Sequence, residues 1–405
     1  MALKNDAALR ERGNRVIPGG MYGHLSVHKH VPKNYPQYFS RAEGCRLWDV
    51  DGNEYIDFLC AFGPMIAGYG NPRIRAAADA QRDQMDTGGG PAPVMIDLAE
   101  HMVHQVSHAD WALFGKNGND ATTVCNMVAR AQNGKRKILV GSHAYHGAQP
   151  WCNHMSPGIP AEEQVHYPTF VYNDVESLTA AAEAVAGDLA GILVSTFKHD
   201  VGYPGELVDP AFARAVRQIC DAEEAALIVD DVRGGLRLTL DASWTAHGVQ
   251  VDLSGWGKAM GNGEPIAAIL GSERYRDAAA SIFATGSFWF QAAPMAAALE
   301  TLQLLEELDA PKRMRAVGQL LRDGLEDQAK RHGHALQQSG PAEMPNLMFE
   351  DDDRQRSKGL SFCEHALNNG VYLNPYHNLF MSVAHTERDI DQALEATNRA
   401  FQALT

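Results

Sequence analysis

The chain has 405 residues, of which 45% are hydrophobic and 8% aromatic, enough to bury a large core, and we expect neither disorder nor membrane spans. Lys and Arg number 35 against 50 Asp and Glu, and the net charge of −15 disfavours nucleic acid as a partner because the surface repels phosphate. The six cysteines lack CxxC spacing and the N-terminus lacks an apolar signal segment, which predicts a cytoplasmic protein with reduced thiols.

The N-terminal stretch predicts an amphipathic helix that ends before Pro18, followed by a hairpin. "RLWDVDGNEYIDF" (residues 46–58) alternates apolar and polar residues around Asp51-Gly52, which is typical of two strands joined by a tight turn.

Residues 60–290 alternate helical patterns with short apolar runs. The runs predict strands at "WALFGK" (111–116), "KILVGS" (137–142), "LAGILVST" (189–196), "AALIVDD" (225–231) and "VDLSGWGK" (251–258). Helical periodicity precedes and separates them, at 71–85, 92–106, 120–132, 175–186 and 209–224. This rhythm predicts a large α/β domain with a mostly parallel sheet that helices cover on both faces.

Residues 291–405 differ in pattern. A long helical stretch (294–333) is followed by strand candidates "LMFE", "VYLNPY" and "LFMSVA", and then by a final helix in "TERDIDQALEATNRAF". We expect a small α+β domain here, which residues 1–59 would join.

Ligands in open α/β sheets bind at the carboxyl ends of the strands, and two of these ends carry ambiguous signals. After residues 111–116, "NGND" leads into a helix; its backbone N–H groups could hold a phosphate, although an ordinary helix cap is the commoner explanation of this motif alone. After residues 137–142, Tyr145 and His146 precede a glycine, where an aromatic could stack on a planar ligand or be part of the core.

A third strand ends in Asp230-Asp231. A carboxylate at this place stays ionised beside a cation, so Asp230 could pair with Arg233 or Arg237, bind a metal, or hold a protonated pyridine nitrogen. The metal reading is weak because no His or Glu stands at ligand spacing, and we expect no metal site.

Lys258, in "LSGWGKAMGNGEP", follows the last of these strands among small residues. It is either a solvated loop residue or a reactive amine. Pyridoxal phosphate (PLP) chemistry needs an amine, a carboxylate, an aromatic and a phosphate turn together. The chain carries all four at strand ends, in the order phosphate turn, aromatic, carboxylate and amine.

The motifs "LIVDDVRGGLR", "DLSGWGKAMGNGEPIAAILG", "NGNDAT" and "AYHG" resemble those of class III aminotransferases of PLP fold type I, in the branch near glutamate-1-semialdehyde aminomutase. The resemblance covers essentially the whole chain. Within the branch, "RVIPGGMYGH", "TGSFWF" and "PYHNLFMSVAHT" are most similar to fumonisin-type amino-polyol aminotransferases.

The resemblance implies a role for each matching residue. Lys258 would form the Schiff base with PLP and move the substrate proton, and Asp230 would hold the pyridinium nitrogen. Val232 would pack on the ring face opposite Tyr145, next to which His146 would also line the cofactor.

The phosphate would be held from two sides. Gly118 and Asn119 would donate backbone N–H groups, and a hydroxyl of Thr285 or Ser287 would reach it from a neighbouring subunit. The resemblance therefore implies an obligate homodimer with shared active sites.

The chain departs from the aminomutase pattern in its substrate region. "MYGHLS" (residues 21–26) has no arginine where the family grips a substrate carboxylate, which disfavours amino acids of the aminomutase type. The "EPV" or "EPI" of many relatives is replaced by "STFKHD", so Ser195 brings no carboxylate. Lys198 could bind a carboxylate there or could be an ordinary surface residue.

The remaining pocket walls would be Tyr22, His24, Phe62 and the turn "SFWF", although Phe288 and Phe290 could equally be core. Such walls suit a bulky or apolar amine. The function expected is transfer of an amino group from an amine or amino-polyol to pyruvate or a similar 2-oxo acid. The alternatives are a PLP isomerase, namely an aminomutase or racemase, and a non-enzymatic protein that kept the fold.

Overall fold

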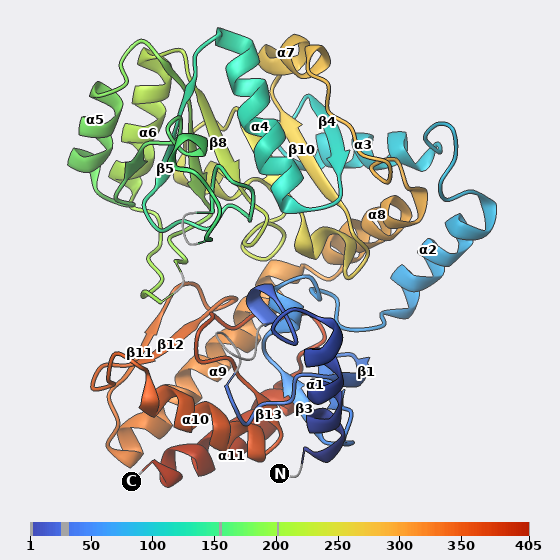
Figure 1. Ribbon diagram of the computed structural model, residues 1–405, viewed down its shortest axis with the longest axis vertical. Coiled ribbons are helices and arrows are strands. Elements are labelled where there is room, and N and C mark those ends of the chain that lie inside the picture. Colours follow the sequence, from blue (N-terminus) through green and yellow to red (C-terminus); the bar gives the residue numbers. More distant parts are fainter. Residues whose placement is uncertain (1–2, 26–31, 154–155, 201, 405) are drawn as a thin grey trace. The chain divides into compact units, whose positions relative to one another are not determined.

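A computed structural model describes residues 3–25, 32–153, 156–200 and 202–404 (Figure 1). It divides into two compact units, Met1–Asn71 with Lys312–Thr405, and Pro72–Pro311. We call these the small unit and the large unit. The units divide at 71/72 and 311/312, further along the chain than the expected 59/60 and 290/291. The second boundary lies later because α8 (Ala292–Glu307) packs on α2 (Pro72–Gln84) and α3 (Val94–Gln105) of the large unit.

The large unit contains a seven-stranded sheet in the order β4-β10-β9-β8-β7-β5-β6. Its strands are β4 (Trp111–Gly115), β5 (Lys137–Gly141), β6 (Thr169–Phe170), β7 (Leu189–Ser195), β8 (Ala226–Asp230), β9 (Leu253–Trp256) and β10 (Ala267–Gly271). Only β10 runs against its neighbours, so the sheet is mostly parallel as expected. The five predicted strands are present, whereas β6 and β10 were not predicted.

Helices cover this sheet. They include α4 (Gly118–Asn133), α5 (Val175–Glu183), α6 (Pro210–Ala222) and the short α7 (Arg276–Ser281). In Figure 1, α4 crosses the face of the sheet beside β4 and β10, and it also contacts β9 and β7. Every residue of β7 and β8 is buried, which places the last residue of β8, Asp230, at the end of an apolar run.

The small unit has two sheets and the remaining helices. The first sheet has the order β1-β2-β3-β13 and the second pairs β11 with β12. The strands are β1 (Phe39–Glu43), β2 (Arg46–Asp49), β3 (Glu54–Asp57), β11 (Leu336–Ser339), β12 (Asn346–Phe349) and β13 (Val371–Tyr372). The helices are α1 (Lys4–Val16), α9 (Ala310–His332), whose first two residues belong to the large unit, α10 (Ser357–Asn368) and α11 (Glu387–Ala403).

Two expectations for the C-terminal part were wrong in detail. The long helical stretch is two helices, α8 and α9, because Asp309 between them has a left-handed backbone (φ 45°). "LFMSVA" forms no strand, since its amides bond to irregular segments; Leu379 N donates to the Pro345 carbonyl and Met381 N to the Glu343 carbonyl. Within the described residues, no helix has the length and apolar character needed to cross a membrane.

Candidate active site

Lys258 begins the 3₁₀ turn that follows β9, and its side chain is only partly exposed. Its backbone is left-handed (φ 42°), which is uncommon and strained for a residue with a side chain. Burial lowers the pKa of its amine to about 7, and the charges of Arg233 and Arg237 act in the same direction while Asp230 opposes them. A substantial fraction of the amine is therefore neutral and nucleophilic near pH 7.

Asp230 ends β8 and lies against His146. Its Oδ2 is 2.7 Å from His146 Nδ1, and its Oδ1 accepts a hydrogen bond from Val232 N at 3.1 Å. Both side chains are buried, and the contact gives the Asp230 carboxylate a polar partner, whereas His146 Nε2 is buried with no hydrogen-bond partner among the described residues. The sequence placed His146 near the ligand but did not pair it with Asp230, because 84 residues separate them.

The stretch "NGND" caps helix α4, and two of its backbone N–H groups remain available as hydrogen-bond donors. Asp120 Oδ2 accepts hydrogen bonds from the backbone N of Lys116 and Asn117, both at 2.9 Å, and Asn119 Oδ1 accepts from Ala148 N at 2.7 Å. The backbone N–H groups of Gly118 and Asn119 begin α4 and donate to no other described residue. They lie at the positive end of the helix dipole, where an anion is stabilised.

Gly118 has no space for a side chain. A Cβ built on it would lie 2.3 Å from Val232 Cγ1, and one built on Gly257 would lie 3.3 Å from Gly118 N. Val232 therefore packs directly against the turn at the start of α4, and Gly257, the residue before Lys258, lies against the same turn. The three segments that carry the expected phosphate donors, ring contact and amine thus meet at one place.

Tyr145 belongs to the surface and is not part of the core. Its side chain is 46% exposed, and the guanidinium carbon of Arg233 lies 6.0 Å from its ring centre. An exposed ring next to a buried cluster can cover a planar ligand.

Thr285 and Ser287 are both exposed, in the loop between α7 and α8. Phe283, Phe288 and Phe290 in the same loop are 88%, 61% and 43% exposed, so the core interpretation of Phe288 and Phe290 is wrong for this chain by itself. We call residues 282–290 the aromatic loop. Among the described residues, neither hydroxyl forms a hydrogen bond with the turn at Gly118.

The expected pocket walls divide between the two units. Tyr22, His24 and Phe62 belong to the small unit, where the His24 ring meets Phe62 edge-on at 4.5 Å and Tyr22 is exposed. Ser26, which ends "MYGHLS", lies outside the described residues. Lys198 belongs to the large unit, where its Nζ pairs with the Glu206 carboxylate beside a cavity of about 140 Å³.

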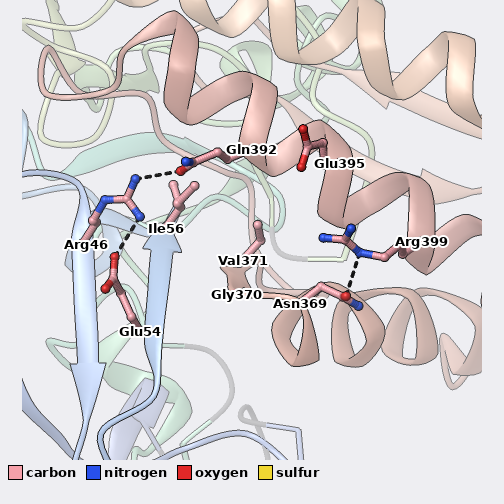
Figure 2. Close-up of a pocket in the computed structure, with 9 residues that line it drawn as sticks. All are labelled: Arg46, Glu54, Ile56, Asn369, Gly370, Val371, Gln392, Glu395 and Arg399. Carbon is pink, nitrogen blue, oxygen red and sulfur yellow. Dashed lines mark hydrogen bonds and ion pairs between the residues drawn. The ribbon is translucent and has the colours of Figure 1, made fainter.

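A second cavity, of about 260 Å³, lies within the small unit between β2, β3 and α11 (Figure 2). Its two arginines are engaged by neighbours: Arg46 bonds to Glu54 and Gln392, and Arg399 Nε donates to Asn369 Oδ1 at 2.8 Å. We read it as a solvated polar cleft of the fold. No cluster of His, Cys, Asp and Glu suited to a metal occurs among the described residues.

The model of one protein family, described as aminotransferase class III, matches residues 28–401. The chain belongs to the class III aminotransferases. Aminopentol aminotransferase of Sphingopyxis macrogoltabida is 50% identical over 396 residues, which cover 98% of this chain and 93% of that protein. A glutamate-1-semialdehyde 2,1-aminomutase of Methanothrix thermoacetophila is 31% identical, covering 98% of this chain and 96% of the relative.

A solved structure of the PLP form of the FumI protein from Sphingopyxis sp. MTA144 is similar over 98% of this chain and 96% of that one, at 50% identity and a TM-score of 0.96. The class III aminotransferase described above is thus a PLP-dependent enzyme of α/β fold, as the sequence motifs indicate. Its own residues fit the cofactor: Asp230 presents a buried carboxylate, Lys258 a partly neutral amine, and Gly118 a turn that any Cβ would fill.

Proposed function

We propose that this class III aminotransferase moves the amino group of an amine or amino-polyol to a 2-oxo acid such as pyruvate. The amine leaves as a ketone and pyruvate leaves as alanine, so the two half-reactions balance. The observation that supports the transfer chemistry is the Lys258 amine, whose pKa burial lowers to about 7 and on which the charge of Asp230, the buried partner of His146, acts. The name of the 50% identical relative, aminopentol aminotransferase, supports the substrate class.

Bound PLP supplies an electron sink and carries the amino group between the two substrates. Asp230 would keep a proton on the ring nitrogen, because its buried carboxylate, oriented by His146, favours a cation beside it. Val232 and Tyr145 would cover the two ring faces. Gly118 and Asn119 would donate their N–H groups to the phosphate.

Lys258 would have two tasks. Its Nζ would hold the cofactor covalently between turnovers, and once released it would take the proton from the amine-bearing carbon of the substrate and return it in the second half-reaction. An amine with a pKa of about 7 suits both, because it is neutral often enough to attack and basic enough to accept a proton.

The substrate class is proposed in part from the absence of an arginine that would bind a substrate carboxylate. No arginine stands in "MYGHLS", and Tyr22, His24 and Phe62 would line the site with aromatic and polar surface instead. Lys198 pairs with Glu206, which makes it a weaker candidate for a substrate carboxylate than its position in the sequence suggests.

We also propose a homodimer in which the aromatic loop of one subunit completes the site of the other. Three exposed phenylalanines in one short loop are typical of a surface that a partner covers. Thr285 or Ser287 would then reach the partner's phosphate turn. The six cysteines are free and buried, in keeping with the cytoplasmic location expected from the sequence.

The proposal is tested with the PLP-loaded enzyme and a panel of amines, each offered with pyruvate or 2-oxoglutarate. Formation of alanine or glutamate together with the ketone is the expected result. Conversion of an amine into an isomer with no requirement for an oxo acid would instead establish the isomerase alternative.

A further inference from the structure

A buried arginine, Arg233, follows the strand end that carries Asp230. Arg233 follows Val232 directly after β8, and only 6% of it is exposed. Its Nη1 donates a hydrogen bond to the His199 carbonyl at 3.1 Å, and its guanidinium approaches the partly exposed Tyr145 ring. Burial lowers its pKa to about 10, which leaves it charged at neutral pH. The sequence motif suggested this residue only as an ion-pair partner for Asp230.

The charge of Arg233 acts on the space around the reactive amine. After burial itself, Arg233 is the largest contributor to the lowered pKa of Lys258. A positive potential that disfavours a proton on the amine attracts an anion to the same region. Asp230 acts on the Lys258 amine in the opposite direction, but its effect is smaller than that of Arg233.

The other cations considered for a carboxylate are less suitable. Residues 21–26 contain none, and Lys198 is held by Glu206 through both its side chain and its backbone. Moreover, a guanidinium presents a planar fork that matches the two oxygens of a carboxylate, whereas an ammonium is a point charge.

We propose that Arg233 binds the carboxylate of the 2-oxo acid acceptor and so determines acceptor specificity. This inference rests on the proposed function. An amine donor that carries hydroxyl groups but no carboxylate would gain only neutral hydrogen bonds from Arg233, so the residue favours the acceptor half-reaction over the donor half-reaction.

The test uses the PLP-loaded enzyme, one amine donor and two acceptors, pyruvate and acetaldehyde, which differ by the carboxylate. The quantity measured is the ratio of kcat/KM for pyruvate to kcat/KM for acetaldehyde. Arg233→Gln should lower this ratio by about 10- to 100-fold, the loss expected for a charged, paired hydrogen bond. Propionate, an inert carboxylate, should also lose affinity for the variant in a calorimetric titration.

Arg274→Gln is the matched control. Arg274 also lies over a tyrosine ring, Tyr275 at 5.5 Å, and donates to a backbone carbonyl, but it is exposed and lies away from the carboxyl end of β8. We expect this variant to keep the wild-type ratio. If Arg233→Gln does not fold, Arg233→Lys replaces it, and a ratio that falls less but in the same direction is expected.

An unchanged ratio in the Arg233 variants overturns the inference, as does a fall in Lys198→Gln but not in Arg233→Gln. Failure of the proposed function would look different from both of these results. The wild-type enzyme would then make no alanine from pyruvate with any amine, and the inference about Arg233 would fail with the proposed function.

Discussion

The surroundings of Lys258 set the pH at which its amine can react. In the apoenzyme its pKa is lowered from 10.5 to about 7 by burial. Below pH 7 the amine is mostly protonated, so covalent attachment of added PLP should slow by about tenfold per pH unit, and above about pH 8 the rate should level off. The measurement is the rate at which the PLP absorbance shifts after mixing.

Lys258→Ala provides the control for this experiment, because it should still bind PLP through the turn at Gly118 without the absorbance shift. It should also be inactive as an aminotransferase. A rate that keeps rising toward pH 10 in the wild-type enzyme would mean that Lys258 is an ordinary solvated lysine.

Asp230 permits a second test at this scale. Asp230→Asn keeps the size of the side chain but removes the charge that would hold the ring nitrogen protonated. We expect kcat to fall by roughly 100- to 1,000-fold, as when other preorganised electrostatic contacts are removed, with a smaller effect on PLP affinity. Asp188→Asn, at a partly exposed carboxylate that pairs with Arg136 and lies outside the candidate site, should leave kcat unchanged. Near wild-type turnover in Asp230→Asn would remove Asp230 from its role.

At the scale of elements, the turn from β4 into α4 depends on close packing against the segment after β8. Gly118→Ala would place a methyl group 2.3 Å from Val232 Cγ1, so one of the two segments must move. We expect at least a tenfold loss of PLP affinity, measured by equilibrium dialysis. Gly89→Ala, where a Cβ meets nothing within 4 Å, is the control and should bind PLP normally. Equal affinities in both variants would contradict the assigned phosphate turn.

The elements also show what the sequence could predict. The buried strands β7 and β8 could be predicted because parallel strands have continuous apolar runs, and residues such as Asp230 could be placed at the strand ends from that pattern. The role expected for Asp230 came from the family resemblance. "LFMSVA" has the same apolar pattern but bonds to irregular segments, which no local pattern reveals. The sequence suggested Arg233 only as an ion-pair partner for Asp230, because its burial and its approach to the Tyr145 ring depend on tertiary structure.

At the scale of the whole molecule, the aromatic loop predicts the assembly. The chain has a mass of 44.1 kDa, and we expect sedimentation at twice this value. The double variant Phe283→Ser, Phe288→Ser should weaken the dimer by at least about 10-fold and lower activity with it, because the two rings are largely exposed in one subunit. Leu320→Ser, at an exposed apolar residue of α9, should remain dimeric. A monomeric, fully active wild-type enzyme would contradict the shared site.

The expected domain boundaries and the two compact units of the structure differ, and α8 lies in the stretch where they differ. The sequence predicts α8 and α9 only as one helical stretch, and the packing of α8 on α2 and α3 assigns α8 to the large unit. The family motifs nevertheless predicted the cofactor and the reaction class, since those depend on strand ends and not on where the domains divide.

The most direct test of the central claim follows the visible absorbance of the PLP-loaded enzyme through both half-reactions. Addition of an amine alone should shift the band as the amino group moves to the cofactor, and later addition of pyruvate should restore the original band with one alanine formed per site. A band that returns without pyruvate, while the amine is recovered as an isomer, would contradict the account.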